Sequence, residues 1–550
     1  MSTILDSVHK PEDIRRLEPF ELPGLAEELR SFMLKTTKTK AGHIQSSLGV
    51  VELTIALHYS YNTPEDVLIW DVGHQAYVHK LLTGRKEVFA SNRKKGGLSG
   101  FTKRSESEYD PFGAGHSSTS ISAAVGFAEA DRLLKRERQY IAVLGDGALT
   151  GGESFEALNY LGERQLNVTV VLNDNESSID SNVGALAHYG NYEALCKAFQ
   201  IDYYCGIDGH NVESLINTFS EVRGNPRPKM IKVDTQKGKG WSPQSSPVIK
   251  NAQNSFQDIF AETLIELARS DERVVAVTPA MLSGSGLDLF QREFPDRTFD
   301  VGIAEQHAVT FSAAMSANGL KPFCHLYSTF SQRAYDQIIH DVALQNLPVV
   351  FCLDRAGLVG EDGPTHHGSF DPGFLNTIPN LIIAAPMDGI SLKGTMHTAL
   401  ASNSPFVIRF PKGGSFEEKL PLPPIPIGQL RKLKAGKEKA VISFGAIGLE
   451  VMKALESTSY AHYDLLYLKP IDSQKIKEIF IDFEEVIVVE ENSAAGAAGE
   501  TINGLKNAWA YSSRLKCRVL PDSFVEHASR QELLEITGLD HKSLRRFIDS

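Results

Sequence analysis

The stretch VLGDGALTGGESFEALNYLGERQLNVTVVLNDNESSIDSN, residues 143–182, decides the fold class because it contains one complete strand–helix–strand unit. A short apolar run ends in Gly-Asp-Gly at residues 145–147, a helical pattern follows, and a second apolar run ends in Asn-Asp-Asn at residues 173–175. Two buried strands joined by a helix pair in parallel, so their carboxyl ends lie side by side. We therefore predict a parallel sheet with both turns at one edge.

The same pattern recurs along the 550 residues. Short apolar runs rich in β-branched residues end in Gly, Asp, Asn or Pro, and helical patterns lie between many of them. Examples are RVVAVTPA (273–280), LPVVFCLDRAG (347–357), LIIAAP (381–386), PFVIRFP (405–411), KAVISFG (439–445) and EVIVVEEN (485–492). Continuous apolar strands that alternate with helices are typical of parallel sheets covered on both faces. The predicted fold class is α/β, with mostly parallel sheets flanked by helices.

Two segments without apolar periodicity divide the chain. Residues 241–255 are rich in Pro, Ser and Asn, and residues 420–429 are dense in proline, so both are typical of linkers. A chain of this length is too long for a single hydrophobic core. We predict three domains, at residues 1–250, 251–420 and 421–550.

The composition limits the classes of function. Hydrophobic residues make up 42% and charged residues 23% of the chain, which is the profile of a globular protein. The formal net charge of -12 disfavours a nucleic-acid binder, since phosphate backbones attract basic surfaces. The five cysteines form no C-x-x-C pair, so we expect reduced thiols and a cytoplasmic location. The polar N-terminus and the lack of long apolar runs predict no signal peptide and no membrane span.

The two turns of the strand–helix–strand unit carry hard oxygen ligands. Asp146 follows the first strand and Asn175 follows the second. Mg²⁺ prefers carboxylate and amide oxygens together with phosphate oxygens and water, and the flanking glycines allow a phosphate to approach the backbone. Each motif alone is also an ordinary turn sequence. Their combination at neighbouring strand ends predicts a site for a metal-bound phosphate.

A third polar feature is the segment GAGHSSTSISAAVGFAEA, residues 113–130. It predicts a helix that begins near Ser117 and Ser118, with free backbone N–H groups that suit a diphosphate. An ordinary N-cap is the alternative interpretation of these two serines.

Glu305 occupies an unusual position. The segment VGIAEQHAVTFSAAMSANG, residues 301–319, begins like a buried strand and continues as a helix, with Glu305 at the junction. Burial of an unpaired carboxylate is costly and raises its pKa. A helix start alone also favours a glutamate. Because the first predicted domain carries a phosphate and metal constellation, we interpret Glu305 as a functional acid.

These motifs resemble a known family. A Gly-Asp-Gly turn followed by an Asn-containing turn is similar to the signature of thiamine diphosphate enzymes. The segments WDVGHQAYVHK (70–80) and DRAGLVGEDGPTHHGSFD (354–371) resemble the 1-deoxy-D-xylulose-5-phosphate synthase family of the transketolase superfamily. The resemblance implies a transketolase-like fold with two cofactor-binding domains and a C-terminal domain. It also implies thiamine diphosphate and Mg²⁺ as cofactors, and a homodimer with each active site between the first two domains of one chain.

The resemblance also implies a reaction, the condensation of pyruvate with D-glyceraldehyde 3-phosphate to give 1-deoxy-D-xylulose 5-phosphate and carbon dioxide. The implied metal ligands are Asp146, Asn175 and the carbonyl of Ser177. The implied cofactor-binding residues are His74, Gly115, Ser117, Gly147, Ala148, Asn175, Lys239, Glu305 and Phe330. The candidate catalytic residues are Glu305, His43, His74, His366 and Asp362. The candidate substrate-binding residues are Arg93, Tyr327, Arg333, Arg355 and Arg409.

The chain departs from the family pattern in two places. Only residues 190–206 stand where the family has a long insertion, and the segment after TQKGKGWSP (235–243) lacks the family's histidine-containing stretch. Loss of a lid would change solvent access and substrate retention more than the chemistry. The alternatives are a transketolase-like ketol transfer with another donor or acceptor, and a catalytically silent paralogue. A nicotinamide dehydrogenase is disfavoured because no G-x-G-x-x-G follows the first strand.

The last predicted domain, residues 421–550, shows no catalytic constellation. We expect it to contribute packing and dimer contacts.

Overall fold

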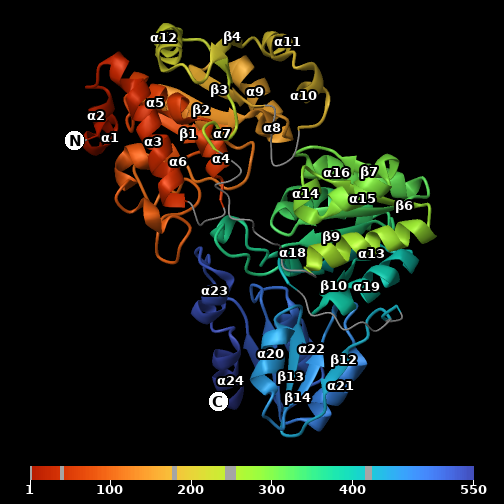
Figure 1. Cartoon of the computed structure of the whole chain (residues 1–550). Coiled ribbons are helices and arrows are strands. Elements are labelled where there is room, and N and C mark those ends of the chain that lie inside the picture. The colour runs from red at the N-terminus through yellow and green to blue at the C-terminus, as the bar shows by residue number, and fades with distance from the viewer. Residues whose placement is uncertain (1–2, 38–41, 176–181, 242–254, 415–423) are drawn as a thin grey trace. The chain divides into compact units, whose positions relative to one another are not determined.

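A computed structural model describes residues 3–37, 42–175, 182–241, 255–414 and 424–550. The chain forms two compact units, one of residues 1–249 with 302–304 and one of residues 250–301 with 305–550 (Figure 1). Residues 242–254 and 420–423 of the two predicted linkers lie outside the described residues, as does Ser177. The division into three domains at residues 250 and 420 stays a prediction. Within the described ranges, no helix is long and apolar enough to cross a membrane.

The first unit is built on a five-stranded parallel sheet with the strand order β1-β2-β3-β5-β4. Its strands are β1 (Val67–Trp70), β2 (Tyr140–Gly145), β3 (Val168–Asp174), β4 (Asp202–Asp208) and β5 (Lys229–Asp234). Strands β2 and β3 pair in parallel, with Gly145 opposite Asn173, and α8 (Asp146–Leu149) and α9 (Gly152–Arg164) connect them. The predicted strand–helix–strand unit is therefore confirmed.

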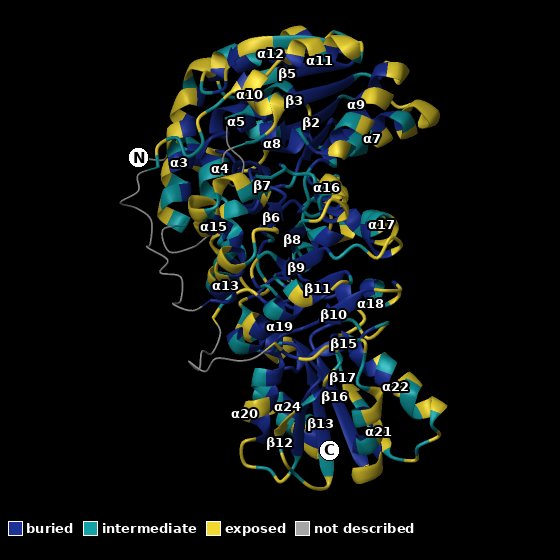
Figure 2. Ribbon diagram, turned by 90° about the vertical axis from the view of Figure 1, so that its right-hand side faces the viewer, coloured by how far each residue is buried: buried dark blue, intermediate teal, exposed yellow. Residues whose placement is uncertain are grey.

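Helices cover both faces of this sheet. Ala142 of β2 belongs to a core cluster that includes α7 (Ser120–Leu134) and α9, whereas the next residue, Val143, belongs to a cluster that includes α5 (Val51–Ser60) and α12 (Val212–Arg223). Successive side chains of a strand point to opposite faces, so a strand that is buried on both faces is apolar at every position. Burial on both sides (Figure 2) accounts for the continuous apolar runs in the sequence. The other helices of this unit are α1 (Ile4–Ser7), α2 (Pro11–Ile14), α3 (Leu22–Thr37), α4 (Ile44–Leu48), α6 (Tyr77–Lys80), α10 (Ala185–Tyr189) and α11 (Tyr192–Ala198).

The second unit contains two sheets. The larger has seven strands in the order β15-β10-β11-β9-β8-β6-β7, and only the β10–β15 pair is antiparallel. Its strands are β6 (Val274–Thr278), β7 (Thr298–Asp300), β8 (Lys321–Tyr327), β9 (Val350–Asp354), β10 (Ile382–Ala384), β11 (Phe406–Arg409) and β15 (Tyr467–Lys469). Strand β15 comes from the sequence predicted as a third domain, so that segment completes the sheet of the segment before it.

The smaller sheet has five strands in the order β12-β14-β13-β16-β17, with β12 and β14 antiparallel and the other pairs parallel. Its strands are β12 (Arg431–Lys434), β13 (Lys439–Phe444), β14 (Ala461–Asp464), β16 (Glu485–Glu490) and β17 (Arg514–Arg518). The α/β fold class predicted from the sequence is confirmed in both units.

Helices flank both sheets of the second unit. The helices packed with the larger sheet include α13 (Phe256–Ser270), α16 (Glu305–Ala317) and α19 (Gly389–Ala401). The smaller sheet packs with α20 (Gly448–Leu455), α21 (Ser473–Asp482), α22 (Ala498–Ala508), α23 (Arg530–Thr537) and α24 (His541–Asp549). Shorter helices are α14 (Leu282–Ser285), α15 (Leu287–Glu293), α17 (Tyr335–Gln337) and α18 (Asp371–Asn376).

Candidate active site

All five strands of the first sheet end at an acidic residue, and those of β4 and β5, Asp208 and Asp234, are exposed. Asp71 follows β1, Asp146 follows β2, and Asp174 is the last residue of β3. Parallel strands present their carboxyl ends at one edge of a sheet, which is where ligands bind in folds of this type. The three of these carboxylates that are not exposed, on Asp71, Asp146 and Asp174, lie at neighbouring strand ends and differ in their partners.

Two of the three carboxylates are compensated. Asp71 accepts hydrogen bonds from the backbone N–H groups of Ser118, at 2.7 Å, and Ser120, at 3.0 Å, where α7 begins. Asp174 forms an ion pair with Lys232, with Nζ 3.0 Å from Oδ2. We expected the amides at the start of α7 to be free for a diphosphate, and this is wrong for Ser118 and Ser120. The reason is that Asp71, at the end of β1, already caps this helix.

Asp146 has no cationic partner within the described ranges, and the nearby side chain of Asn182 only partly offsets the effect of burial on its pKa. Its side chain is buried, its Oδ1 accepts the N–H of Gly147 at 2.8 Å, and its Oδ2 has no hydrogen-bond partner among the described residues. Burial raises the pKa of Asp146 to about 6, and the nearby carboxylate of Asp174 adds to the rise. A buried carboxylate without a cationic partner is costly, and a bound divalent ion would remove that cost.

The turn before Asp146 leaves space among the described residues. A Cβ placed on Gly145 would meet no atom of these residues within 4 Å, apart from its chain neighbours. Asn175 directly follows β3. No group of three or more His, Cys, Asp or Glu side chains in the described part of the chain could hold a metal ion. A metal at this edge therefore needs amide, carbonyl or phosphate oxygens in addition to the Asp146 carboxylate, as the sequence predicts.

The remaining diphosphate candidates lie around α8 and α7. Gly147 and Ala148 are residues of α8, and Gly115 and Ser117 lie in the irregular segment before α7. The hydroxyl of Ser118 donates to the carbonyl of Ala148 at 2.7 Å, which fixes the start of α7 against the Gly-Asp-Gly turn.

A second group in the first unit contains the predicted histidines His43 and His74. Their rings lie edge to face with centroids 5.8 Å apart. Burial lowers the pKa of His74 to about 3, and the positive charges of His43 and Lys237 contribute, so His74 is neutral at physiological pH. Its Nδ1 is buried without a hydrogen-bond partner in the described ranges. A neutral, desolvated imidazole can accept or donate a hydrogen bond at a substrate.

Arg93 lies close to this histidine pair. A Cβ added to Gly42, the neighbour of His43, would meet the Cδ of Arg93 at 3.4 Å, and one added to Gly100 would meet its Cγ at 3.1 Å. Lys239 has a different environment, since its Nζ lies 4.0 Å from the carboxylate of Glu52. The lysine that influences His74 is Lys237, which the sequence did not single out.

The second unit carries the predicted acid Glu305. The helix α16 begins at this residue, as expected, whereas the preceding strand β7 already ends at Asp300. The Glu305 side chain is 6% exposed, and its burial raises its pKa, while the positive charge of Arg333 opposes this rise. The helix thus places a desolvated carboxyl group next to a predicted substrate-binding arginine.

Four further candidates of the second unit form a continuous stack. The guanidinium of Arg355 lies 3.9 Å from the ring centroid of Tyr327. Tyr327 stacks on Phe330 with centroids 5.4 Å apart, and His366 meets Phe330 edge to face at 5.6 Å. The structure therefore brings together residues from three separate segments. A contact between arginine and an aromatic ring contributes about 0.5–2 kcal/mol, depending on its exposure.

Arg409 is placed differently from our expectation of an arginine open to phosphate. Its guanidinium is buried and donates to both carboxylate oxygens of Asp371, at 2.7 and 3.1 Å. It also donates to the carbonyl of Gly368 at 3.1 Å and to Oδ1 of Asn492 at 2.8 Å. A buried arginine needs an acidic partner, and Asp371 at the start of α18 supplies it. Asp362 is half-buried at the start of the 3-10 turn Gly363–Thr365.

Three residues of these groups have a left-handed backbone. They are Arg93, with φ 63°, Ser118, with φ 74°, and Arg355, with φ 58°. This conformation costs about 1–3 kcal/mol for a residue with a side chain and occurs preferentially at functional sites. It supports the assignment of Arg93 and Arg355, and it points to Ser118, next to the predicted Ser117.

The comparisons with known proteins first define the class. Residues 252–415 match the transketolase pyrimidine binding domain, and residues 428–544 match the transketolase C-terminal domain. These matches, together with parallel sheets that carry acids at a strand edge, define a protein of the transketolase type. Residues 5–194 match the family model of 1-deoxy-D-xylulose-5-phosphate synthase.

The 1-deoxy-D-xylulose-5-phosphate synthases of Cytophaga hutchinsonii and Parabacteroides distasonis are each 42% identical to the chain, and each alignment covers 99% of this chain and 98% of the relative. The chain belongs to the 1-deoxy-D-xylulose-5-phosphate synthase family. A solved transketolase structure from Campylobacter jejuni aligns with 97% of this chain and 100% of its own at 18% identity, with a TM-score of 0.46.

These alignments also bear on the two short segments. They extend over 621 and 618 positions, whereas the chain has 550 residues, so the chain lacks segments that these relatives carry.

Proposed function

We propose that this protein condenses pyruvate with D-glyceraldehyde 3-phosphate to give 1-deoxy-D-xylulose 5-phosphate and carbon dioxide, with thiamine diphosphate and Mg²⁺ as cofactors. The family relationship over 99% of the chain supports the reaction. The structural observation that carries the proposal is the contrast between Asp146 and its neighbours. Of the three acids at this sheet edge that are not exposed, Asp71 and Asp174 have backbone or lysine partners, and Asp146 is left to bind a cation.

The residues present fit the cofactor. Asp146 and Asn175 would hold Mg²⁺ through oxygen atoms, which this ion prefers together with phosphate oxygens. Gly147 and Ala148 would lie along the diphosphate, and Phe330 would stack on the aminopyrimidine ring. When bound, thiamine diphosphate supplies the nucleophilic carbon and the electron sink that decarboxylation of a 2-oxo acid requires.

Glu305 would hold the proton that activates the cofactor. Because burial raises its pKa, Glu305 can keep a proton nearer neutral pH than an exposed glutamate and can share it with a ring nitrogen. His74, which stays neutral, and His366 would donate hydrogen bonds to substrate oxygens or accept protons from them. Asp362 would assist from the loop that carries His366.

The substrates are anionic, and the arginines would bind them. Arg355 is oriented by Tyr327 and by an ion pair between its Nη1 and the buried Asp354, which leaves its other guanidinium nitrogens for a substrate. Arg333 lies close enough to Glu305 to influence its pKa. We assign both arginines to the carboxylate or phosphate of a substrate, with Arg93 in the same role in the first unit. Arg409 would contribute only if it exchanged part of its contact with Asp371. We further propose a homodimer in the cytoplasm, and the five cysteines, all free thiols, are compatible with that compartment.

The test is to incubate the protein with pyruvate, D-glyceraldehyde 3-phosphate, thiamine diphosphate and Mg²⁺, and to identify the product by mass while carbon dioxide is measured. We expect both products, and omission of pyruvate should abolish them. Glu305→Gln should lose nearly all turnover but still bind the cofactor, whereas Glu293→Gln, at a partly exposed acid paired with Arg269, should keep it. Turnover from a ketose donor without carbon dioxide would identify a transketolase instead. Cofactor binding without any turnover would identify a silent paralogue.

A further inference from the structure

The segment from Gly357 to Gly368 forms a closed loop that carries two of the candidate catalytic residues. The N–H of Gly357 donates to the carbonyl of Gly368 at 2.7 Å, and the N–H of Gly368 donates back to the carbonyl of Gly357 at 2.8 Å. These two hydrogen bonds fix the ends of the loop to each other. Asp362 and His366 lie between them, so their positions depend on what holds the loop as a whole.

The first turn of the loop is held by an acid from another part of the sequence. Oε1 of Glu491, which directly follows β16, accepts the backbone N–H of Leu358 at 2.6 Å. A Cβ added to Gly357 would approach the Glu491 carboxyl carbon to 2.7 Å, and the backbone of Gly357 has a φ of +78°. Only glycine allows so close an approach in this conformation. The carboxylate thus lies directly against the loop backbone.

Arg530, the first residue of α23, completes this contact. Its Nη1 donates to the carbonyl of Leu358 at 2.5 Å and to Oε1 of Glu491 at 2.6 Å, and its Nη2 donates to Oε2 of Glu491 at 2.8 Å. The Glu491–Arg530 pair therefore binds both polar backbone groups of Leu358. Glu491 is 6% exposed, whereas the Arg530 side chain is 32% exposed, so these charge-assisted hydrogen bonds are shielded from water on the side of Glu491.

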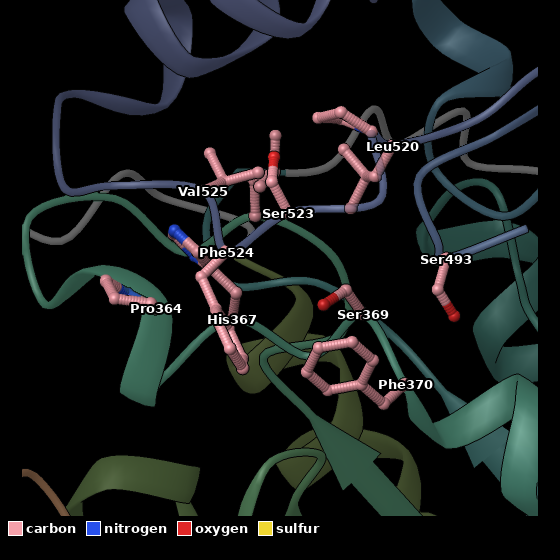
Figure 3. Close-up of a pocket in the computed structure, with 11 residues that line it drawn as sticks. Pro364, His367, Ser369, Phe370, Ser493, Leu520, Ser523, Phe524 and Val525 are labelled. Atoms are coloured by element: carbon pink, nitrogen blue, oxygen red, sulfur yellow. The ribbon is translucent and has the colours of Figure 1, made fainter.

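Other C-terminal residues contact the rest of the loop. A Cβ on Gly363 would meet the Cβ of His527 at 3.0 Å, and the N–H of Ser493 donates to the carbonyl of Ser369 at 3.0 Å. Between these contacts lies a small pocket that is lined by Pro364 and His367 of the loop and by Phe524 of the C-terminal segment, among others (Figure 3).

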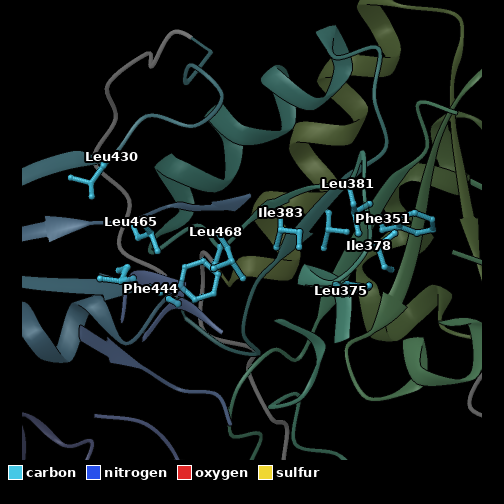
Figure 4. Close-up of a cluster of buried hydrophobic side chains, with 14 of the residues drawn as sticks. Phe351, Leu375, Ile378, Leu381, Ile383, Leu430, Phe444, Leu465 and Leu468 are labelled. Carbon is cyan, nitrogen blue, oxygen red and sulfur yellow. The ribbon is translucent and has the colours of Figure 1, made fainter. Parts of the chain in front are cut away.

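The C-terminal sheet can act as a fixed support because it shares a hydrophobic core with the larger sheet. One cluster contains Phe351 and Ile383 of the larger sheet together with Phe444 of β13, and Leu465 and Leu468 lie between them (Figure 4). A continuous close-packed core transmits position between the elements that it joins. The hydrogen bond from the loop N–H of Leu358 to Glu491 therefore fixes the loop relative to the larger sheet.

We propose that Glu491 and Arg530 are positioning residues, which hold the loop of residues 357–368 so that Asp362 and His366 face the substrate. This inference rests on the proposed function, because only that function gives Asp362 and His366 a role. It assigns the segment of residues 421–550 a part in catalysis, beyond the packing and dimer contacts expected from its sequence. Neither residue touches the substrate.

The variants follow from the chemistry of the pair. Glu491→Gln keeps an oxygen that can accept the N–H of Leu358 but removes the charge that Arg530 needs, and Arg530→Gln removes the guanidinium. The matched control is Glu485→Gln, at the opposite end of β16. Glu485 is similarly buried and pairs with Lys439, at 3.0 Å, and Lys516, at 2.8 Å. The control loses an equivalent ion pair that does not contact the loop.

The first measurement is amide hydrogen exchange in the full-length protein, with and without thiamine diphosphate and Mg²⁺. We expect exchange in peptides that cover residues 358–368 to accelerate by about ten-fold or more in Glu491→Gln and Arg530→Gln, as loss of a charged hydrogen bond predicts. Glu485→Gln should leave these peptides unchanged. Unchanged exchange in both test variants would overturn the proposal. Because hydrogen exchange does not require turnover, it tests the support of the loop separately from the proposed synthase activity. If the wild-type protein lacked synthase activity but exchange in the loop still accelerated in the two variants, only the proposed function would be refuted.

The second measurement is steady-state kinetics. The test variants should lower kcat by about ten-fold while KM for pyruvate stays within about two-fold, because the loop carries proton-transfer groups and the interactions lost act on the transition state. Arg530→Lys should recover part of kcat, since it restores the positive charge beside Glu491. A fall in kcat equal to that of Glu485→Gln would contradict the proposal. If a test variant does not fold, Gly357→Ala replaces it, because the added methyl would collide with the Glu491 carboxylate and separate it from the loop backbone without removing either charge.

Discussion

Replacement of Asp146 by asparagine is predicted to stabilise the cofactor-free protein, although it removes a metal ligand. The asparagine side chain would keep an oxygen that accepts the N–H of Gly147. It would replace Oδ2, which has no partner in the described residues, by an amide N–H₂ group. That group can donate to the nearby carboxylate of Asp174. A repulsion between two carboxylates is thus exchanged for a hydrogen bond.

The magnitude follows from the pKa of Asp146. Burial, with Asp174 as a second cause, raises this pKa from 3.8 to about 6, so the ionised form is the less stable one in the folded state. The folded protein therefore loses stability as the pH rises through about 6, and the loss is absent below about 4, where both folded and unfolded chains are protonated. At pH 8 the difference corresponds to about 3 kcal/mol. For a unit of this size, this shifts the unfolding midpoint by roughly 5–10 °C.

The assay is thermal unfolding of wild type and Asp146→Asn at pH 8 and pH 4.5, with and without thiamine diphosphate and Mg²⁺. Without cofactor the variant should unfold at the higher temperature at pH 8, and the difference should shrink at pH 4.5. With cofactor the order should reverse, because only the wild type gains stability from binding. Asp234→Asn, at an exposed acid that ends the neighbouring strand β5, is the matched control and should change little. A variant that is less stable at pH 8 without cofactor would refute the burial argument, and one that is still stabilised by Mg²⁺ and cofactor would refute the metal assignment.

Two further predictions concern groups around this edge and in the cores. Burial lowers the pKa of four histidines, His58, His74, His79 and His462, so below a pH of about 6.5 the unfolded chain binds more protons than the folded one. The thermal unfolding midpoint should therefore fall as the pH is lowered from about 6.5 to about 5, and a constant midpoint would contradict the prediction. The measurement is made in the Asp146→Asn variant, which removes the opposite contribution of Asp146. Asp71→Asn leaves one oxygen for the two amides of Ser118 and Ser120 and removes a negative charge from the start of α7, so the free energy of unfolding should fall by about 1–2 kcal/mol. Urea unfolding measures this loss, and a loss no larger than that of Asp234→Asn would show that Asp71 is not a significant cap.

The placement of Asp146, Asn175 and Glu305 could be predicted from the sequence because local patterns determine it. Each follows or begins a regular element, and the direction of parallel strands then decides the edge at which a side chain lies. The same rule would have found Asp71, which directly follows the apolar run of residues 67–70. Its partners at the start of α7 could not be predicted, because they lie in a distant segment of the sequence.

The contacts of Arg409 and Glu491 mark the limit of such reasoning. Arg409 lies at the end of an apolar strand, as a ligand-binding arginine would. However, its N–H groups donate to Asp371 and Asn492, and both residues are remote in sequence. Glu491 looks like an ordinary strand end, yet it binds the backbone of Leu358. Charge compensation between distant segments is a property of the tertiary structure. A sequence motif can therefore identify a charged residue without showing whether its charge is available.

A carboxylate oxygen without a hydrogen-bond partner, rather than a shifted pKa, distinguishes a candidate metal ligand from an acid with a structural role. Burial raises the pKa of Glu490 as it does that of Glu305 and Asp146. Glu490, however, accepts the N–H groups of Ala498 and Gly499 at 3.1 and 2.8 Å, so its oxygens serve to cap α22. Asp146 has a buried oxygen with no such partner in the described chain, and a raised pKa there reports a cost that the folded protein alone does not relieve. A ligand that supplies the missing positive charge relieves it, which is why the least satisfied acid at the sheet edge is the one expected to bind the metal.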